Sequence, residues 1–142
     1  MEEIKIRDYL LENGIRPMNK RVKIMNYMVA RRNHPTADMI YLELVNEIAG
    51  LSKTTVYNTL NLFVQEKIAR ALHIDSNELR YDADTSQHGH FKCNECGEVY
   101  DFSLNTELLQ DLRLKNFVLD DYQFSINGTC SICNKQQITD LV

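Results

Sequence analysis

The stretch HGHFKCNECGEVYD, residues 88–101, gathers two thiols, two imidazoles and a terminal aspartate in one short segment. Its C-x-x-C pair, Cys93 and Cys96, is followed further along by a second pair, Cys130 and Cys133. Two residues between cysteines let one turn present both sulfurs to one ion, so the two pairs predict a closed, tetrahedral Zn²⁺ site. The histidines and the aspartate remain, and their nitrogen and oxygen donors indicate a second metal with a different role.

The length and composition predict a globular protein of one domain or two small ones, because the chain has 142 residues and is 44% hydrophobic. It contains no apolar run of membrane-spanning length, and its acidic, amphipathic start is unlike a secretory signal. We therefore expect a cytoplasmic protein with no membrane partner. Thiols stay reduced in that compartment, which favours metal binding over disulfides. Disulfide pairing is the alternative that this reasoning leaves open.

The charge is unevenly distributed along the chain. The formal net charge is −4, but residues 1–67 carry +2 and residues 68–142 carry −6. A basic half joined to an acidic half rich in Cys, His and Asp suggests a nucleic-acid reader coupled to a cation site.

The first half has the pattern of a winged helix. Apolar periodicity, with Thr36 and Ser52 as N-caps and Asn13-Gly14 and Gly50 as stops, predicts four helices followed by a β-hairpin. A helix, a glycine turn and a further helix make a helix-turn-helix, and the hairpin would be its wing. A helical bundle with an incidental hairpin is the alternative. The expected helices are 2–12, 18–32, 37–48 and 53–66, and the hairpin covers 68–83.

The last of these helices has a polar face suited to DNA. Lys, Thr, Tyr and Asn side chains can contact phosphates and base edges when a helix enters the major groove, and basic residues upstream can contact phosphates. A merely solvated face is the other interpretation of such a pattern. The candidate DNA-binding residues are Arg16, Lys20, Arg21, Lys53, Thr54, Tyr57, Asn58 and Asn61.

The second half predicts a small unit that needs help to fold. A hinge at 84–87 precedes expected strands at 89–92 and 98–102, a helix at 104–114, and a mostly extended segment at 117–127. About 55 residues with few core side chains are marginal alone, so a bound Zn²⁺ and dimerisation are expected to stabilise them.

Three segments of the chain resemble the ferric uptake regulator (Fur) superfamily of bacterial metal-dependent repressors. They are HPTADMIY at 34–41, LSKTTVYNTL at 51–60, and the H-x-H-x-x-C-x-x-C-G signature at 88–97. The resemblance implies an α+β fold with a winged helix-turn-helix DNA-binding domain at 1–83. A hinge at 84–87 then leads to a small α/β dimerisation and metal-binding domain, with a four-cysteine zinc site, at 88–142.

The resemblance also implies two metal sites and two partners. Structural Zn²⁺ would be held by Cys93, Cys96, Cys130 and Cys133. A regulatory Fe²⁺ or Mn²⁺ would be held by His34, Asp82, His88, His90 and Asp101. The partners would be double-stranded operator DNA and a second copy of the chain, as a homodimer, with no organic cofactor.

The choice of ligands is most similar to the peroxide-responsive repressor branch of the superfamily. Iron-sensing members usually have Glu where Asp82 stands and often where Asp101 stands, and no thiol is spare for a zinc sensor. In the peroxide-responsive branch, Fe²⁺ and hydrogen peroxide oxidise a ligand histidine, here matched by His34 or His88. The alternative is an iron or manganese uptake regulator without peroxide sensing, and a zinc-ribbon metalloenzyme is a remote one; we expect no enzymatic activity.

Two departures from the superfamily's patterns stand out. Lys53-Thr54-Thr55 occupies the start of the expected recognition helix, where small residues are more usual, and this leaves the operator sequence open. Gly89 separates His88 and His90, where iron-sensing members tend towards a His-His-Asp-His run.

Overall fold

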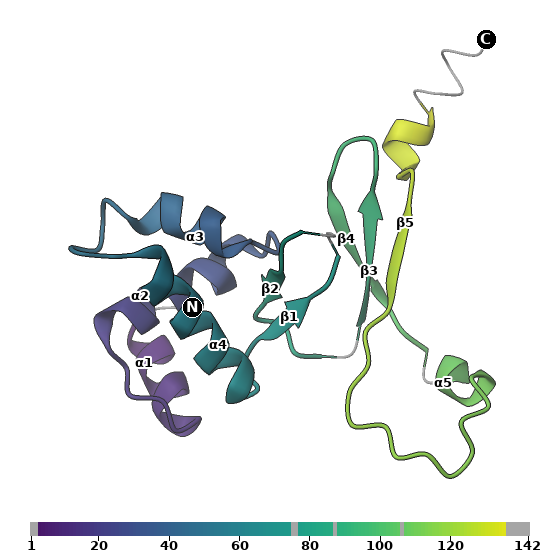
Figure 1. The fold of residues 1–142 in the computed structure, drawn as a ribbon, viewed down its shortest axis with the longest axis horizontal. Coiled ribbons are helices and arrows are strands. Elements are labelled where there is room, and N and C mark those ends of the chain that lie inside the picture. The colour runs from purple at the N-terminus through teal and green to yellow at the C-terminus, as the bar shows by residue number, and fades with distance from the viewer. Residues whose placement is uncertain (1–2, 75–76, 87, 106, 136–142) are drawn as a thin grey trace. The chain divides into compact units, whose positions relative to one another are not determined.

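The structure is a computed structural model that describes residues 3–74, 77–86, 88–105 and 107–135. The chain divides into two compact units, with the boundary between Thr85 and Ser86. The first unit contains α1 (Glu3–Glu12), α2 (Asn19–Arg31), α3 (Ala37–Leu44), α4 (Lys53–Gln65), β1 (Arg70–Leu72) and β2 (Arg80–Asp82) (Figure 1). The second contains β3 (His88–Cys93), β4 (Val99–Ser103), α5 (Glu107–Asp111) and β5 (Ser125–Gly128). Within the described ranges, no helix is both long and apolar enough to cross a membrane.

The apolar faces of the four helices form the core of the first unit. Val22 and Met25 of α2 pack with Ile40 of α3 and with Leu60 and Phe63 of α4, all fully buried. Their spacing is that of an amphipathic helix, so the periodicity predicted these helices to within a residue or two, apart from the end of α3.

The first helix ends as its sequence predicted. Gly14 takes a φ of +76°, and the N–H of Ile15 bonds back to the carbonyl of Leu10. That six-to-one bond is a Schellman cap, which requires a left-handed residue and is therefore best served by glycine.

The third helix ends at Leu44, four residues before the predicted end at Ile48. The Leu44 carbonyl accepts bonds from the N–H groups of both Glu47 and Ile48, so the chain tightens into turns there. These turns still bury Ile48, and Gly50, at φ +71°, then leads into α4. The apolar periodicity therefore continued beyond the helix itself, which made the predicted helix too long.

A two-stranded wing follows the helix-turn-helix and confirms the predicted winged-helix fold. β1 and β2 pair antiparallel, with Arg70 opposite Asp82. The segment before α3 joins this hairpin, because the N–H of Tyr81 donates to the carbonyl of Pro35 and Thr36 forms a β-bridge with Arg80.

The second unit is a three-stranded sheet in the order β4-β3-β5. β3 pairs antiparallel with β4 and parallel with β5, so the central strand contacts both neighbours. Apart from Cys93 and Cys130, the only buried side chains of its described residues are His88 and His90. The described part of this unit therefore lacks an apolar core of its own.

Two expected elements of the second unit are shorter than predicted. The helix expected over 104–114 is seen over Glu107–Asp111, and Arg113, in the left-handed region at φ +56°, prevents its continuation. The strand expected over 117–127 is confined to Ser125–Gly128, the stretch that pairs in register with β3. Adjacent residues Phe117 and Val118 are both exposed, so their alternation does not mark one buried face.

Candidate metal centres and nucleic-acid interface

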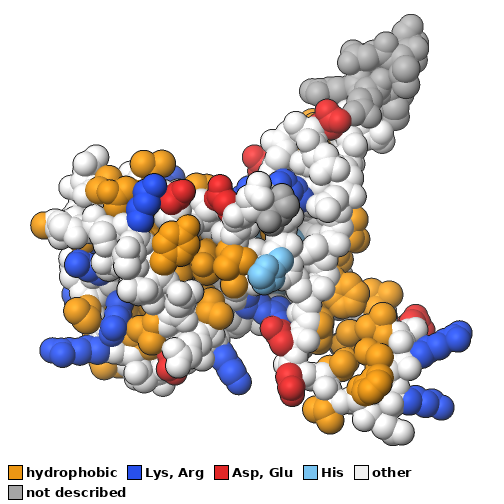
Figure 2. Space-filling view, viewed as in Figure 1, with side chains coloured by type: hydrophobic (Ala, Val, Ile, Leu, Met, Phe, Trp, Pro, Cys, Tyr) orange, Lys and Arg blue, Asp and Glu red, His pale blue; other side chains and the backbone are white. Residues whose placement is uncertain are grey.

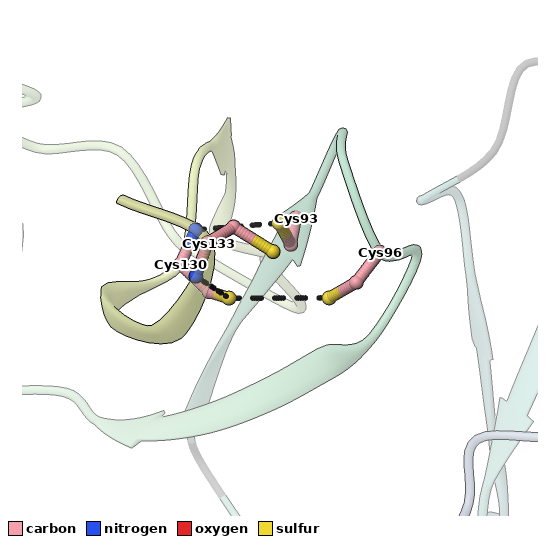
Figure 3. A group of neighbouring side chains, drawn as sticks. All are labelled: Cys93, Cys96, Cys130 and Cys133. Atoms are coloured by element: carbon pink, nitrogen blue, oxygen red, sulfur yellow. Dashed lines mark hydrogen bonds between the residues drawn. The ribbon is translucent and has the colours of Figure 1, made fainter. Parts of the chain in front are cut away.

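The four cysteines converge at one end of the sheet of the second unit. Cys93 ends β3, and Cys130 follows β5, which is the parallel neighbour of β3. Each C-x-x-C pair turns back on itself, and one ligand atom from each cysteine lies within 4.8 Å of the others (Figure 3). All four sulfurs therefore converge in a cluster that can bind Zn²⁺ in the closed manner of structural sites.

Backbone donors prepare part of this cluster to bind a cation. The N–H of Cys130 lies 3.3 Å from Cys93 Sγ and is the largest cause that lowers the pKa of the Cys93 thiol, to about 6. The N–H of Cys133 similarly lowers the pKa of Cys130. Thiolate is the form that binds metal, so each C-x-x-C pair has one sulfur already biased towards ligation.

The other two thiols are shifted in the opposite direction. Hydrogen bonding with Cys130 raises the pKa of Cys133 to about 12. The N–H of Glu98 lowers the pKa of Cys96, but desolvation and hydrogen bonding with Cys93 and Cys130 outweigh it, and the net shift is upward. Four thiolates this close would repel one another, so full deprotonation needs a cation among them. The electrostatics of the cluster thus fit Zn²⁺.

A second group of donors lies on β3 and β4. Residues 88 and 90 share one face of β3, because side chains alternate along a strand. The register sets His90 opposite Asp101, whose Oδ1 lies 3.3 Å from His90 Nε2 and 3.7 Å from His88 Nε2. Asp101 is about half exposed while both histidines are buried. Two imidazoles and one carboxylate therefore converge on one point at the sheet surface.

His88 is oriented by a backbone carbonyl. Its Nδ1 lies 2.8 Å from the carbonyl oxygen of Ser86, and a carbonyl can only accept, so Nδ1 carries the proton. In the neutral ring, Nε2 then has the lone pair, which is the tautomer that a metal ligand needs. Sequence reasoning missed this role of Ser86, because a backbone carbonyl leaves no signal in the residue type.

Gly89 allows the strand to carry these histidines. It faces away from them, opposite Phe102 on β4, and a Cβ at position 89 would lie 2.1 Å from Phe102 Cζ. Any side chain there would collide with the ring. This close packing accounts for glycine at the position where the superfamily's iron-sensing pattern has a polar residue.

A third group lies in the first unit. His34 Nε2 is 3.6 Å from Asp82 Oδ2, and the two side chains are 7% and 12% exposed. His34 precedes α3 with φ +49°, and Arg80 donates from Nη1 to its carbonyl at 3.1 Å. The N–H of Asp84 donates to the other oxygen of Asp82, Oδ1, at 2.9 Å. The segment before α3 and the wing therefore place a histidine and a carboxylate side by side, with Asp82 Oδ2 nearest the imidazole.

The predicted regulatory ligands thus form two sets, a His–Asp pair in the first unit and a His–His–Asp group in the second. Both sets contain only nitrogen and oxygen donors, which suit Fe²⁺ or Mn²⁺. The assignment of all five to one ion stays a prediction.

The polar face predicted for α4 is solvent-exposed. Ser52 caps the helix by accepting from the N–H of Thr55 at 3.1 Å, and Val56, Leu60 and Phe63 turn inward. The five candidate DNA-binding residues of this helix all lie on its exposed side: Lys53, Thr54, Tyr57, Asn58 and Asn61.

Basic residues of α2 lie beside this face. Lys20 and Arg21 line a cavity of about 220 Å³ together with Asn58 of α4. Arg21 donates from Nη1 to the carbonyl of Arg16 at 3.0 Å, and Arg16 itself is exposed. Cations and an amide at one concave surface can bind a phosphate of the DNA backbone while α4 faces the groove.

Several known proteins resemble this chain in sequence and in fold. The profile of the ferric uptake regulator family matches residues 12–127. The peroxide operon regulator of Bacillus subtilis is 32% identical over 131 residues, which cover 90% of each chain. The Vibrio cholerae ferric uptake regulator superposes with a TM-score of 0.71 at 24% identity, covering 87% of this chain and 98% of that one. The Streptococcus pyogenes peroxide sensor PerR superposes with a TM-score of 0.53 at 27% identity, covering 92% of each. The chain belongs to the ferric uptake regulator family.

Proposed function

We propose that this protein is a metal-dependent transcriptional repressor that binds operator DNA as a homodimer and senses hydrogen peroxide by histidine oxidation. The observation that carries this proposal is that the sulfur donors and the nitrogen and oxygen donors form separate groups. All four cysteines gather in one cluster, which leaves only imidazoles and carboxylates for a second metal. The 32% identity with the Bacillus subtilis peroxide operon regulator supports the same assignment.

The sensing site would combine the His34–Asp82 pair with His88, His90 and Asp101. Three imidazoles and two carboxylates form a borderline-to-hard ligand set that fits Fe²⁺ and Mn²⁺. The two sets come from different units of the chain, so one shared ion would favour one arrangement of those units. A metal that binds this arrangement better shifts the population towards it, and we propose that it is the DNA-binding form.

Hydrogen bonds to the ligand side chains prepare both sets for a cation. The bond from His88 Nδ1 to Ser86 directs the Nε2 lone pair at the site, and the N–H of Asp84 occupies one oxygen of Asp82. Such contacts fix ligand orientation before the metal arrives. Bound Fe²⁺ would supply the redox chemistry that reduces hydrogen peroxide, whereas Mn²⁺ would support DNA binding alone.

The proposed signal is a covalent change in His34 or His88. One oxygen atom of hydrogen peroxide is added to a ring carbon of the imidazole, and the other leaves as water, so the protein gains 16 Da, the mass of one oxygen, and no other reductant is required. An oxidised ring is a poorer ligand, so metal and then DNA would be released.

DNA binding is proposed for residues 1–83, with α4 in the major groove. The exposed face of α4 and the neighbouring Lys20 and Arg21 support this role. In helix-turn-helix proteins the second helix reads bases while other elements fix its position on the phosphates.

Dimerisation is proposed for residues 88–142, beyond a hinge at 84–87. Orange side chains gather over α5 and the segment after it in Figure 2, where Leu112, Phe117 and Val118 are 49%, 66% and 87% exposed. A unit with no apolar core and this much exposed apolar surface is expected to bury it against another chain. A cytoplasmic location, where the thiols remain reduced, completes the proposal.

The test is mass spectrometry of Fe²⁺-loaded protein treated with dilute hydrogen peroxide. We expect a +16 Da mark on the peptide that contains His34 or His88, and no such mark with Mn²⁺. The exposed His73, outside the proposed ligand set, is the internal control and should remain intact. If every histidine stayed intact while Fe²⁺ still promoted DNA binding, the protein would be a metal-uptake regulator and the peroxide proposal would be wrong.

A further inference from the structure

Lys53, the first residue of α4, has an arrangement of contacts that its family resemblance does not explain. We propose that Lys53 is a specificity-determining residue that reads a guanine of the operator, and that Asp38 and Tyr41 of α3 position its ammonium group. This inference rests on the proposed DNA binding and deepens it, because it names a residue and a base rather than a face.

Two contacts restrain the ammonium group across the helix-turn-helix. Lys53 Nζ lies 3.6 Å from Asp38 Oδ1 and 5.7 Å from the centroid of the Tyr41 ring. The Lys53 and Asp38 side chains are 59% and 48% exposed, so the pair stands at the surface beside the start of α4. The ammonium is therefore held towards α3 by a carboxylate and an aromatic face.

Stability gives little reason for this arrangement. An ion pair between side chains this exposed contributes little to folding stability, because water screens it. A cation in the first turn of a helix also faces the positive end of the helix dipole, which disfavours it. Asp38 is well placed in the first turn of α3 without Lys53. The pairing is therefore better explained by a ligand than by folding.

The chemistry of the pair fits a base edge better than a phosphate. Residues at the start of a recognition helix contact bases in the major groove, and lysine donates to O6 and N7 of guanine. The Asp38 carboxylate would repel a phosphate bound to Lys53, whereas it is compatible with the paired cytosine, whose N4 is a donor. Donor and acceptor side by side therefore match a G·C pair.

A lysine discriminates between bases only if its ammonium group is held in position. Its long, flexible stem and three rotating donors usually make it a contact of low geometric selectivity. With its ammonium paired to Asp38 and over the Tyr41 ring, Lys53 samples fewer directions. Asp38 and Tyr41 are therefore positioning residues, and Lys53 is the residue that contacts the base.

The experiment selects binding sites from randomised duplex DNA with full-length, Zn²⁺- and Mn²⁺-loaded protein, and then compares Lys53→Met with the parent protein. We expect the parent to require guanine at one position in each half-site. Lys53→Met should lose that preference alone, with about tenfold weaker binding to the selected site, in line with one lost base contact. Lys67→Met, which removes an exposed lysine just beyond the other end of α4, is the matched control and should keep every preference.

A second variant tests the positioning. Asp38→Asn leaves Lys53 in place but removes the carboxylate that positions it, so we expect weaker discrimination at the same guanine. Binding to unrelated DNA should become tighter, since a negative charge is removed. A uniform loss of affinity in Lys53→Met, with the salt dependence reduced by about one phosphate contact, would make Lys53 a backbone contact and overturn the inference. Unchanged preferences in Lys53→Met would also overturn it. If the parent protein bound no DNA with either metal, the proposed function itself would fail.

Discussion

The packing of Gly89 against Phe102 makes a quantitative prediction. In Gly89→Ala the new methyl carbon would lie 2.1 Å from Phe102 Cζ and 2.4 Å from Cε2, against ordinary carbon contacts of about 3.5–4.0 Å. The ring must therefore move, and overpacking of this kind costs about 1–3 kcal/mol. Alanine in a strand is otherwise favoured over glycine by roughly 0.5–1 kcal/mol. The two effects together give an expected net loss of stability of about 0–2.5 kcal/mol in the second unit.

The matched control is the same substitution in a Phe102→Ala background. Without the ring the clash is absent, and only the strand preference remains. There Gly89→Ala should stabilise by roughly 0.5–1 kcal/mol. The assay is urea unfolding of zinc-loaded protein, followed by zinc release to a chromogenic chelator, which reports on the unit that holds the cysteines. The double-mutant cycle isolates the contact between residues 89 and 102.

Gly89→Ala should also affect the proposed sensing site, because Gly89 lies between His88 and His90. A shift of this strand changes ligand orientation, and such changes typically weaken metal binding about tenfold. Equal effects of Gly89→Ala with and without the Phe102 ring would refute the reasoning. If a destabilised Gly89→Ala protein bound Mn²⁺ with unchanged affinity, the predicted effect on His88 and His90 would be wrong.

Individual contacts lead to three more predictions. Zn²⁺ binding at pH 7 should release the protons of Cys96 and Cys133, whose pKa values are raised, and calorimetry in buffers of different ionisation enthalpy would detect them; a buffer-independent heat would contradict this. His90→Ala or Asp101→Asn should abolish Mn²⁺-dependent DNA binding with unchanged zinc content, and loss of zinc would show that the two sites are not separate. Ser52→Ala removes the cap of α4 and should cost about 1 kcal/mol in urea unfolding of the first unit, where an unchanged midpoint would contradict it.

Sequence reasoning succeeded where one local rule was sufficient. The caps at Thr36 and Ser52 and the left-handed Gly14 fixed helix boundaries, because each satisfies helix-end groups within a few residues. The two C-x-x-C pairs could be assigned to one metal site for the same reason, since the sequence gives both the ligand type and the spacing.

Reasoning from sequence failed where pairing across the chain decides the structure. The segment 117–127 was predicted to be mostly a strand from its apolar residues, yet strand formation needs a partner, and the β3 pairing covers only Ser125–Gly128. Phe117, Val118 and Leu119 are exposed in the single chain, so these apolar residues mark a surface and not an internal core. The contact of Phe102 with Gly89 was likewise invisible, because it depends on the register between β3 and β4.

β3 carries ligands of both proposed sites, with His88 and His90 near its start and Cys93 at its end. Cys93 lies only three positions, roughly 10 Å of strand, beyond His90. The order in which the metals arrive should therefore matter. We expect zinc-free protein to bind Mn²⁺ more weakly than protein given Zn²⁺ first, which a titration in both orders of addition would measure; identical affinities would contradict this. Under the proposed function, a cell short of zinc would then lose its response to peroxide even with ample iron.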